Sequence, residues 1–535
     1  MPSSRRGFLK HAVASTALLC ADRAAHAAQQ EHCTAPTNNE QQRQLLNLVM
    51  VFPDEMRAHA QQFMGMDPAH TPRIDRFARE SCVMRQAVSN YPLCTPARGM
   101  IMSGQYPIHN GMTGNCHDYG ALVGIDLSSR TACWSDVLRA QGYALGYVGK
   151  WHLDAPRAPY VQSYNNPVHG TKWNEWTPPE RRHGFDFWHA YGTYDMHMSP
   201  MYWTNQSDRD HPIHVAQWGP IYEADVAIQY LRNDRRKYRD PVKPFALVVS
   251  MNPPHSPYDQ VPKKYLDLYD GMNSRTLNIR STVNWDKKYE AGYGPEYMKS
   301  YLAMVSGVDE QFGRILDEID AQGLRNNTLV VFFSDHGCCM GAHGEPTKNN
   351  YFEESLRIPM MFRLPGVIAP RSDDLLMSLP DLYPTVLGLL GLSDKTPITV
   401  EGADWSVRVK TGKGNGATSQ LYFSIPYGGS AYGKRGIRTE QYTLSIERKD
   451  KEMLRYVLYD NLLDPFQENN IAESNPALIA ELVKHELEPW LEYTGDPWRP
   501  QPFDSEAGST NHFAFEIKRE NPRLAGDSPP KRSPL

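Results

Sequence analysis

Short continuous apolar runs that end in polar residues are the feature of this sequence that most restricts its fold. The runs cover residues 45–52, 144–148, 245–251 and 328–333. An apolar run of this length without alternating polar residues is typical of a strand buried on both faces, as in a parallel sheet. Asp54 and Glu55 follow the first run, and Asp335 and His336 follow the last. The runs therefore predict a sheet whose strand ends carry polar chemistry.

Segments with helical spacing of apolar residues lie between these runs. We expect helices over residues 71–84, 134–142, 221–231, 298–322 and 382–390. The first helix has Thr71 as its cap and Pro72 in its first turn, where a proline costs no hydrogen bond. Residues 155–203 are rich in aromatic side chains and lack periodicity, so we expect long loops there. Strands that alternate with helices predict an α/β fold, with helices on both faces of a mostly parallel sheet.

The chain is long enough for two domains. Its 535 residues exceed what one hydrophobic core normally supports. A glycine-rich linker occupies residues 411–416, and short strands are expected beyond it at 420–424, 436–439, 442–446 and 456–460, followed by a helix over 476–493. We therefore expect a larger domain over residues 45–411 and a smaller one over residues 417–500.

The N-terminal segment has the features of a bacterial export signal. Arg5 and Arg6 precede an apolar run, residues 12–20, that is too short to span a bilayer as a permanent helix. Ala25 and Ala27 offer small residues for cleavage. These features predict a twin-arginine signal peptide over residues 1–27, a mobile lead over 28–44 and a C-terminal tail over 501–535. The Tat machinery would then export a folded protein, without a stable membrane anchor, to the periplasm or beyond.

Composition limits the class of protein further. The hydrophobic content of 40% and the charged content of 22% are those of a soluble globular enzyme. A net charge of −5 gives no basic footprint for nucleic acid. Apart from Cys20 in the predicted signal and Cys94, the cysteines available for disulfides in an oxidising compartment are Cys33, Cys82, Cys116, Cys133, Cys338 and Cys339. Their pairing stays open, but the neighbours Cys338 and Cys339 are not expected to bond to each other, because such a bond is strained.

The stretch around Cys94 places a cysteine, a proline and an arginine at the start of a helix. Pro96 fits the first helical turn, where its missing N–H costs nothing. Cys94 then lies at the helix N-terminus, where unpaired N–H groups favour an anion. Arg98 projects toward the same end, about one turn later. A buried structural cysteine would give the same local pattern, so the meaning of Cys94 depends on the residues that accompany it.

The polar residues at the strand ends form a candidate metal site. In a parallel sheet all strand carboxyl ends open on one edge, so Asp54, Glu55, Asp335 and His336 are expected to meet. Three carboxylates suit a hard divalent cation such as Ca²⁺ or Mg²⁺. The imidazole leaves Mn²⁺ or Zn²⁺ open. The alternative is that these residues cap helices or form turns at the ends of their strands.

The candidate segments follow one another in a recognisable order. They are Asp54-Glu55, Cys94-Thr95-Pro96-Ala97-Arg98, Gly149-Lys150-Trp151-His152, Pro254-His255-Ser256-Pro257-Tyr258, Asp335-His336-Gly337 and Lys348. This order resembles that of the sulfatases of the alkaline phosphatase superfamily. Residues 436–439 and 459–465 are similar to patterns of the family's C-terminal subdomain. The resemblance implies an alkaline phosphatase-like α/β/α sandwich, plus a smaller α+β subdomain with an antiparallel sheet.

The resemblance also implies an unusual nucleophile. Cys94 would be oxidised to formylglycine by a formylglycine-generating enzyme, and the hydrated aldehyde would offer one hydroxyl to attack sulfur and another to expel sulfate. One divalent cation, most simply Ca²⁺ with Mg²⁺ or Mn²⁺ as alternatives, would be held by Asp54, Glu55, Cys94, Asp335 and His336. A sulfate ester is an anion, so its reaction requires cations fixed around it.

The remaining roles follow from the same resemblance. Arg98 would orient the nucleophile, and Lys150 and Lys348 would hold the sulfate oxygens. His152 would take up a proton when sulfate is expelled, and His255 would help to protonate the departing alcohol. Proton transfers of this kind typically contribute about 10²–10⁴-fold each.

The expected activity is hydrolysis of a sulfate monoester, either of a carbohydrate or of an aryl or alkyl alcohol. One alternative is a phosphonate monoester hydrolase or phosphodiesterase on the same scaffold. A second is a catalytically silent carbohydrate-binding relative, against which the complete charged set argues. The chain departs from the family pattern at Glu55, where Asp, Asn or Gln is usual, at Ala97, where many relatives have serine, and at Cys338-Cys339, where many lack cysteine.

Overall fold

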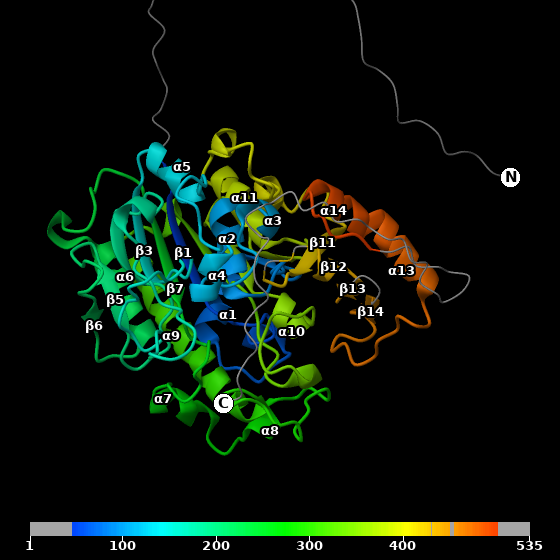
Figure 1. Ribbon diagram of the computed structural model, residues 1–535. Helices are drawn as coiled ribbons and strands as arrows, with labels where there is room; N and C mark the ends of the chain where they lie inside the picture. Colours follow the sequence, from blue (N-terminus) through cyan, green and yellow to red (C-terminus); the bar gives the residue numbers. More distant parts are fainter. Residues whose placement is uncertain (1–44, 428, 430, 450–453, 501–535) are drawn as a thin grey trace, which may run out of the picture. The chain divides into compact units, whose positions relative to one another are not determined.

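The apolar runs form the centre of a large sheet in the computed structural model, which describes residues 45–427, 429, 431–449 and 454–500. Ten of the described strands make up this sheet, in the order β10-β2-β9-β8-β1-β7-β3-β4-β5-β6. Figure 1 shows β1, β3 and β7 side by side within it. Their bounds are β1 (Asn47–Pro53), β2 (Cys82–Met84), β3 (Ala144–Lys150), β4 (Phe187–Tyr191), β5 (Met201–Thr204), β6 (Ile213–His214), β7 (Phe245–Met251), β8 (Thr328–Phe333), β9 (Met360–Arg363) and β10 (Arg371–Asp373). The central strands from β8 to β4 run parallel, whereas β9, β5 and β6 pair antiparallel with their neighbours. The expected mostly parallel sheet is confirmed.

Strand β1 lies in the middle of this sheet and is buried on both faces, as its uniformly apolar sequence predicts. Leu48, Met50 and Phe52 pack into the core on one face, and Val49 and Val51 pack into the core on the other. None of these side chains is more than 3% exposed. Because successive side chains of a strand point to opposite faces, this one run supplies both halves of the core.

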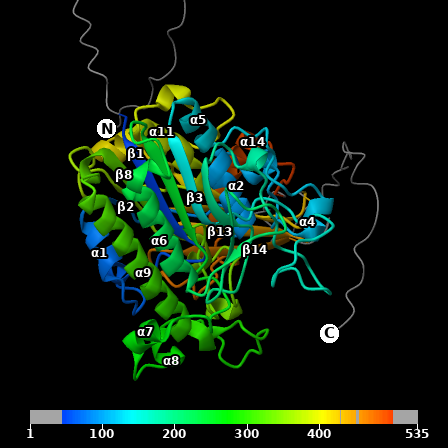
Figure 2. The same cartoon turned by 90° about the vertical axis from the view of Figure 1, so that its left-hand side faces the viewer.

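Helices cover both faces of the sheet, as expected for an α/β/α sandwich. One face carries α1 (Pro72–Arg79), α6 (Gly219–Arg232) and α9 (Met298–Ala321), and the other carries α2 (Cys94–Ser103), α5 (Trp134–Ala140) and α11 (Leu382–Leu389) (Figures 1 and 2). The shorter helices are α3 (Pro107–Asn110), α4 (Asp118–Leu122), α7 (Lys263–Leu266), α8 (Ser274–Leu277), α10 (Glu353–Leu356) and α12 (Ser406–Thr411).

Two sequence-based expectations about this part of the chain are wrong. The helix expected over residues 71–84 ends at Arg79, and Cys82–Met84 form strand β2 instead, which pairs with β9 and β10. The region 155–203, expected to contain only loops, holds β4 and β5. Strand β4 pairs with β3, and its Trp188 and Ala190 are buried. Long-range pairing decides the structure of both segments, and local propensity does not reveal it.

A second, antiparallel sheet forms beyond the expected linker. It contains β11 (Ser419–Ser424), β12 (Gly433–Thr439), β13 (Tyr442–Arg448) and β14 (Leu454–Asp460), in this order. Leu421 and Phe423 of β11 belong to the same hydrophobic core as Leu48 of β1, so the two sheets share one core. The domain boundaries expected near residues 411 and 417 stay a prediction.

The C-terminal helix is divided, whereas the sequence predicts one helix over residues 476–493. Helices α13 (Pro476–Leu482) and α14 (Glu488–Tyr493) are joined by a wider π-helical turn over Val483–Leu487. Pro489 has no N–H to donate to the turn before it, which interrupts the regular hydrogen-bond ladder at this point.

Several expectations concern the chain ends and the cysteines. The predicted signal peptide, lead and C-terminal tail lie outside the described residues, as do Cys20 and Cys33. Within the described ranges, the buried cysteines that form no disulfide are Cys82, Cys94, Cys116, Cys133, Cys338 and Cys339. Cys338 and Cys339 are therefore not bonded to each other, as expected. No helix in the described part of the chain combines the length and the apolar character that crossing a membrane requires.

An ion pair joins the second sheet to helix α10. Arg438 of β12 and Glu353 form two hydrogen bonds of 3.0 Å, and both side chains are only 3% exposed. We expect Arg438→Ala to lower the free energy of unfolding by about 3 kcal/mol, because a buried carboxylate loses both hydrogen bonds to Arg438 and keeps only Arg357, at 3.8 Å. Denaturant titration followed by tryptophan fluorescence measures the loss.

The matched control for this variant is Lys263→Ala. It removes an ion pair with Asp267 in which the lysine side chain is 83% exposed, and the unfolding midpoint should hardly move. Equal losses in the two variants would mean that the buried pair does not secure the second sheet.

Candidate active site

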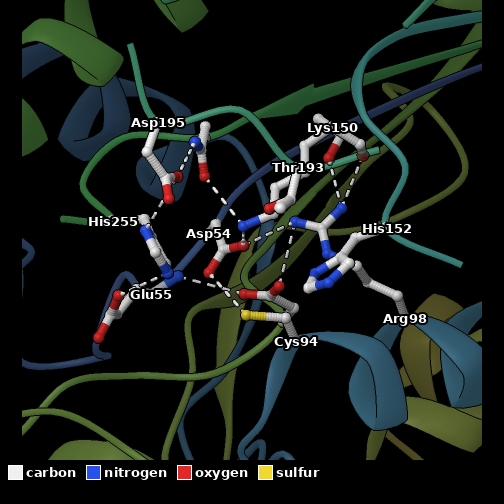
Figure 3. Close-up of polar contacts among 12 residues, drawn as sticks. Asp54, Glu55, Cys94, Arg98, Lys150, His152, Thr193, Asp195 and His255 are labelled. Carbon is white, nitrogen blue, oxygen red and sulfur yellow. Dashed lines mark hydrogen bonds and ion pairs between the residues drawn. The ribbon is translucent and has the colours of Figure 1, made fainter. Parts of the chain in front are cut away.

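The carboxyl ends of the central strands bring the predicted residues together at one edge of the sheet. Asp54 and Glu55 follow β1, Asp335 and His336 follow β8, Lys150 is the last residue of β3, and Cys94 is the first residue of α2. Figure 3 shows several of these side chains converging in a single network of polar contacts. The expected meeting of the two acidic strand ends is confirmed, since Glu55 N donates to Asp335 Oδ1 at 3.2 Å.

Arg98 lies at the centre of this network. Its Nη2 is 3.1 Å from Asp54 Oδ2 and 3.1 Å from Asp335 Oδ2. Its Nη1 donates to Lys150 O at 2.7 Å and to Ser250 Oγ at 2.8 Å. Through these contacts Arg98 joins four strand ends to helix α2 (Figure 3). Its side chain is only 2% exposed.

Two lysines hold the acidic residues from the other side. Lys150 Nζ is 2.6 Å from Asp54 Oδ2 and donates to Asn252 Oδ1 at 3.0 Å. Lys348 Nζ is 3.1 Å from Glu55 Oε2. Burial would raise the pKa of Asp54, yet Lys150 and Arg98 hold it well below its usual range. The three buried carboxylates of the site are therefore each within ion-pair distance of a lysine or arginine.

The Cys94 thiol lies between these charges. Its Sγ is 3.7 Å from Asp54 Oδ1 and 3.4 Å from His336 Nε2. Burial would raise the pKa of the thiol, but the positive charges of Lys348 and Lys150 lower it well below its usual value. The environment at position 94 favours a negatively charged or strongly polar group, as the predicted helix N-terminus suggests.

Asp54, Asp335 and His336, together with Cys94, form a cluster that can hold a metal ion. One ligand atom from each lies within 4.8 Å of the others. Burial and the neighbouring Asp54 raise the pKa of Asp335, which records a repulsion that a divalent cation would relieve. Burial would lower the pKa of His336, but Asp335 raises it to about 9, so metal binding would release a proton from this ring. An oxygen-rich set with one imidazole fits a hard divalent cation.

Glu55 occupies a different position from the other predicted metal ligands. Its Oε2 contacts Lys348 and lies 3.6 Å from His255 Nε2, so it groups with Asp54 and His255. Its Oε1 is buried and accepts no hydrogen bond from nitrogen or oxygen. This unused oxygen is available to a cation beside Asp54. The thiol of Cys338 lies beside the same carboxylate, and burial together with Glu55 raises the pKa of that thiol.

The two predicted histidines flank the site. His152 has a left-handed backbone, with φ of 53°, and its Nε2 is 3.1 Å from Cys116 O. Burial lowers the pKa of His152, which keeps this ring neutral beside Cys94. Burial and Lys348 would lower the pKa of His255, yet Glu55 and Asp54 raise it. One histidine is thus suited to accept a proton and the other to donate one.

A cavity of about 350 Å³ opens above these groups. It is lined by Cys94, Asn115, Lys150, His152, Asn165, Trp173, Thr193, Asp195, His255, Glu290, Tyr293, Pro346, Thr347 and Lys348. All of the predicted catalytic side chains except Arg98 reach this cavity. Arg98 does not line the cavity. The cluster Asp54, Asp335 and His336 lies behind the lining, where Asp54 contacts Lys150 and His336 contacts Cys94.

The site also contains polar residues that the sequence motifs do not mark. Asn252 links Lys150 to Asp195, because its Oδ1 accepts from Lys150 and its Nδ2 donates to Asp195 Oδ1 at 3.2 Å. Asn252 directly follows the run 245–251, so the strand-end rule used for Asp54 would have found it. Asn115 and Asp195 lie in loops without periodicity, and no local signal marks them.

Two family models match the chain. The model described as Sulfatase covers residues 46–392, and the one described as N-sulphoglucosamine sulphohydrolase, C-terminal, covers residues 341–492. The chain belongs to the sulfatase family. The resemblance of its motifs is thereby confirmed, as is the expectation of a sulfatase enzyme.

Similar proteins cover almost the whole described fold of this sulfatase. The endo-4-O-sulfatase of Bacteroides thetaiotaomicron is 36% identical over 87% of this chain and 96% of its own. The ulvan-active sulfatase of Formosa agariphila is 32% identical over 86% of this chain and 81% of its own. The crystal structure of yidJ from Bacteroides fragilis superposes with a TM-score of 0.80 at 44% identity, covering 88% of this chain and 98% of that one.

A buried glutamic acid behind the site of this sulfatase makes stability depend on pH. Glu223 of α6 accepts from Tyr191 at 3.3 Å and from Tyr202 at 3.1 Å, and burial raises its pKa to about 8. Near pH 6 the folded protein keeps this proton, whereas the unfolded chain has lost it. Stability therefore falls as pH rises from the unfolded pKa toward 8, and Glu223→Gln removes this dependence.

Denaturant titrations at pH 6 and pH 8 measure the difference. Relative to Glu223→Gln, the wild type should lose roughly 2 kcal/mol between the two values. Parallel pH profiles for the two proteins would show that Glu223 ionises in the folded state as it does in the unfolded chain.

Proposed function

We propose that this sulfatase hydrolyses a sulfate monoester of a carbohydrate. The observation that carries the proposal is the convergence of Lys150, Lys348, His152 and His255 on Cys94 in one cavity. Two cations suit the oxygens of a sulfate group, and two histidines of opposite pKa direction suit the proton transfers of its hydrolysis. The carbohydrate part rests on the names of the endo-4-O-sulfatase and the ulvan-active sulfatase, which are similar over most of the chain.

The nucleophile in this proposal derives from Cys94. The thiol sulfur of the structure stands where the side chain of formylglycine would lie, at the start of α2 and beside the metal cluster. Formylglycine supplies, when formed, a hydrated aldehyde whose hydroxyl oxygen attacks sulfur. Its making requires a formylglycine-generating enzyme as a maturation partner.

The cation in this proposal is one Ca²⁺, with Mg²⁺ or Mn²⁺ as alternatives. Asp54, Glu55, Asp335 and His336 would hold it together with the modified residue 94. When bound, the ion supplies positive charge next to the sulfate oxygens and the nucleophile. The unused buried oxygen of Glu55 and the repulsion between Asp54 and Asp335 support this assignment.

The protein's own side chains complete the chemistry. Lys150 and Lys348 neutralise the sulfate and fix its orientation toward residue 94, and Arg98 holds Asp54 and Asp335 beside the nucleophile. His152 accepts a proton at residue 94, consistent with its lowered pKa. His255, whose pKa is raised, delivers a proton to the oxygen of the departing alcohol. The S–O bond to the sugar breaks and leaves a hydroxyl on the sugar and inorganic sulfate.

Export belongs to the same proposal. The twin-arginine motif at Arg5 and Arg6 supports passage through the Tat machinery to the periplasm or the medium. A sulfated carbohydrate substrate too large to enter the cell would be met there. We propose no nucleic-acid partner, in keeping with the net charge of −5.

The nucleophile assignment is tested with Cys94→Ala. We expect kcat/KM for 4-nitrophenyl sulfate to fall by more than about 10³-fold, because the attacking group is lost. The circular dichroism spectrum should stay unchanged. Mass spectrometry of the tryptic peptide with Cys94 should show the aldehyde in active wild-type protein. Full activity of the variant, or an unmodified thiol in active protein, would refute the assignment.

The reaction class is tested in the same assay. An aryl sulfate and an aryl phosphate diester are offered in parallel to the wild type. We expect the higher kcat/KM for the sulfate. A large preference for the diester would favour the alternative phosphonate monoester hydrolase or phosphodiesterase.

The metal assignment is tested by thermal unfolding. Calcium at about 100 times its dissociation constant should stabilise the wild type by roughly 2.7 kcal/mol, and a chelator should remove the effect. Asp335→Asn should abolish the calcium-induced rise in Tm. The control Asp210→Asn changes an exposed carboxylate away from the cluster and should keep the rise. A rise retained by Asp335→Asn would contradict the assignment.

A further inference from the structure

A row of aromatic rings leads from the catalytic cavity to the surface. Trp173 lines the cavity, and its ring centroid is 4.9 Å from that of His117. His117 is 5.0 Å from Tyr427 and stacks at 6.2 Å on Tyr119. Tyr119 and Tyr427 meet edge to face at 5.7 Å. We call Trp173, His117, Tyr119 and Tyr427 the aromatic row.

The row is assembled from parts of the chain that are far apart in sequence. His117 caps helix α4, where its Nδ1 accepts from Gly120 N, and Tyr119 lies in the first turn of that helix. Trp173 comes from the long loop before β4, and Tyr427 from the segment after β11 of the second sheet. The contact between these rings therefore depends on the tertiary fold and not on any one helix or strand.

The row is fixed to the catalytic machinery through Asn115. The Tyr427 hydroxyl accepts a hydrogen bond from Asn115 N at 3.0 Å, and Asn115 Oδ1 accepts from the backbone N–H of Thr95 at 3.0 Å. Thr95 is the neighbour of Cys94. A Cβ at Gly114 would lie 2.4 Å from the Tyr427 ring, so only glycine at this position lets the ring pack against the backbone. The outer rings therefore keep a fixed position relative to the nucleophile.

The outer half of the row is open to solvent. Tyr119 is 38% exposed and Tyr427 37% exposed, whereas His117 is buried beneath them. Aromatic rings with one open face and a fixed orientation offer an apolar surface at little entropic cost. The C–H faces of a pyranose ring are apolar in the same way, while its hydroxyls remain in water.

The size of the cavity limits how much of a carbohydrate can fit inside it. About 350 Å³ is at the lower end of the range for ligand pockets. A sulfated sugar ring occupies such a cavity, and the rest of a longer carbohydrate must leave it. The aromatic row starts in the cavity at Trp173 and reaches the surface at Tyr119 and Tyr427, with the buried His117 packed between them, so it offers a ring-binding surface beside the cavity.

We propose that the aromatic row is a subsite for the sugar ring next to the sulfated one, and that the substrate is an oligosaccharide or polysaccharide, not a sulfated monosaccharide. The proposal rests on the proposed sulfate ester hydrolysis. Tyr119 and Tyr427 stack on the neighbouring ring, and Asn115 keeps that ring in register with position 94. The connection between β11 and β12 thereby takes part in substrate selection through Tyr427.

The test compares substrates of different length. The wild type is assayed with 4-nitrophenyl sulfate and with two matched pairs: a 4-O-sulfated glycosaminoglycan tetrasaccharide with its sulfated monosaccharide, and a ulvan oligosaccharide with its sulfated monosaccharide. We expect kcat/KM for the cleaved oligosaccharide to exceed that for its monosaccharide by at least about 10-fold. Equal values, or cleavage of the aryl sulfate with no oligosaccharide cleaved, overturn the subsite. No hydrolysis of any sulfate ester overturns the proposed function instead.

Variants then locate the effect in the row. Tyr119→Ala and Tyr427→Leu should each lower the ratio of kcat/KM for the oligosaccharide to kcat/KM for 4-nitrophenyl sulfate by about 3- to 10-fold. Tyr119→Phe keeps the ring and should restore the ratio. Phe63→Ala, which removes an aromatic side chain that is also 37% exposed, is the matched control and should leave it unchanged. An unchanged ratio in both tyrosine variants refutes the proposal.

Discussion

The site depends on the ion pairs that the buried guanidinium of Arg98 forms with two carboxylates. It lies between Asp54 and Asp335, which would otherwise repel each other in a medium of low dielectric constant. The same group binds Lys150 O and Ser250 Oγ, so it also joins the ends of β3 and β7 to those of β1 and β8. Since Arg98 and Cys94 share one helical turn of α2, the position of the proposed nucleophile is set by the contact that stabilises Asp54 and Asp335.

Much of this architecture is already visible in the sequence, for a physical reason. A strand buried on both faces must be apolar throughout, so β1 and β8 stand out as runs, and the polar residues after them must lie at the sheet edge. That logic places Asp54 and Asp335 correctly. The same reasoning applies to Asn252, which directly follows the apolar run of β7. The order of the motifs supplies the remaining candidate side chains, Lys150, His152, His255 and Lys348.

The rest depends on contacts that have no local signature. Strand β2 and strand β4 are short, and pairing with distant strands decides their structure against the local pattern. Asp195 and Asn115 reach the cavity from loops, where hydrogen bonds to Asn252 and to the backbone of Thr95 hold them. The contact between Glu55 and the Cys338 thiol joins two departures from the family pattern that are far apart in sequence, and only the folded chain brings them together.

The unpaired cysteines of the described interior bear on whether the chain should fold before or after it meets an oxidant. Burial is the largest of the influences that raise the pKa of the thiols of Cys82, Cys116, Cys133, Cys338 and Cys339, so little reactive thiolate is present in the folded state. A chain that met an oxidant while unfolded would expose every one of these sulfurs to mispairing. A chain that folds in a reducing compartment first encloses them before any oxidant is met. The packed interior then shields these thiols from the oxidant.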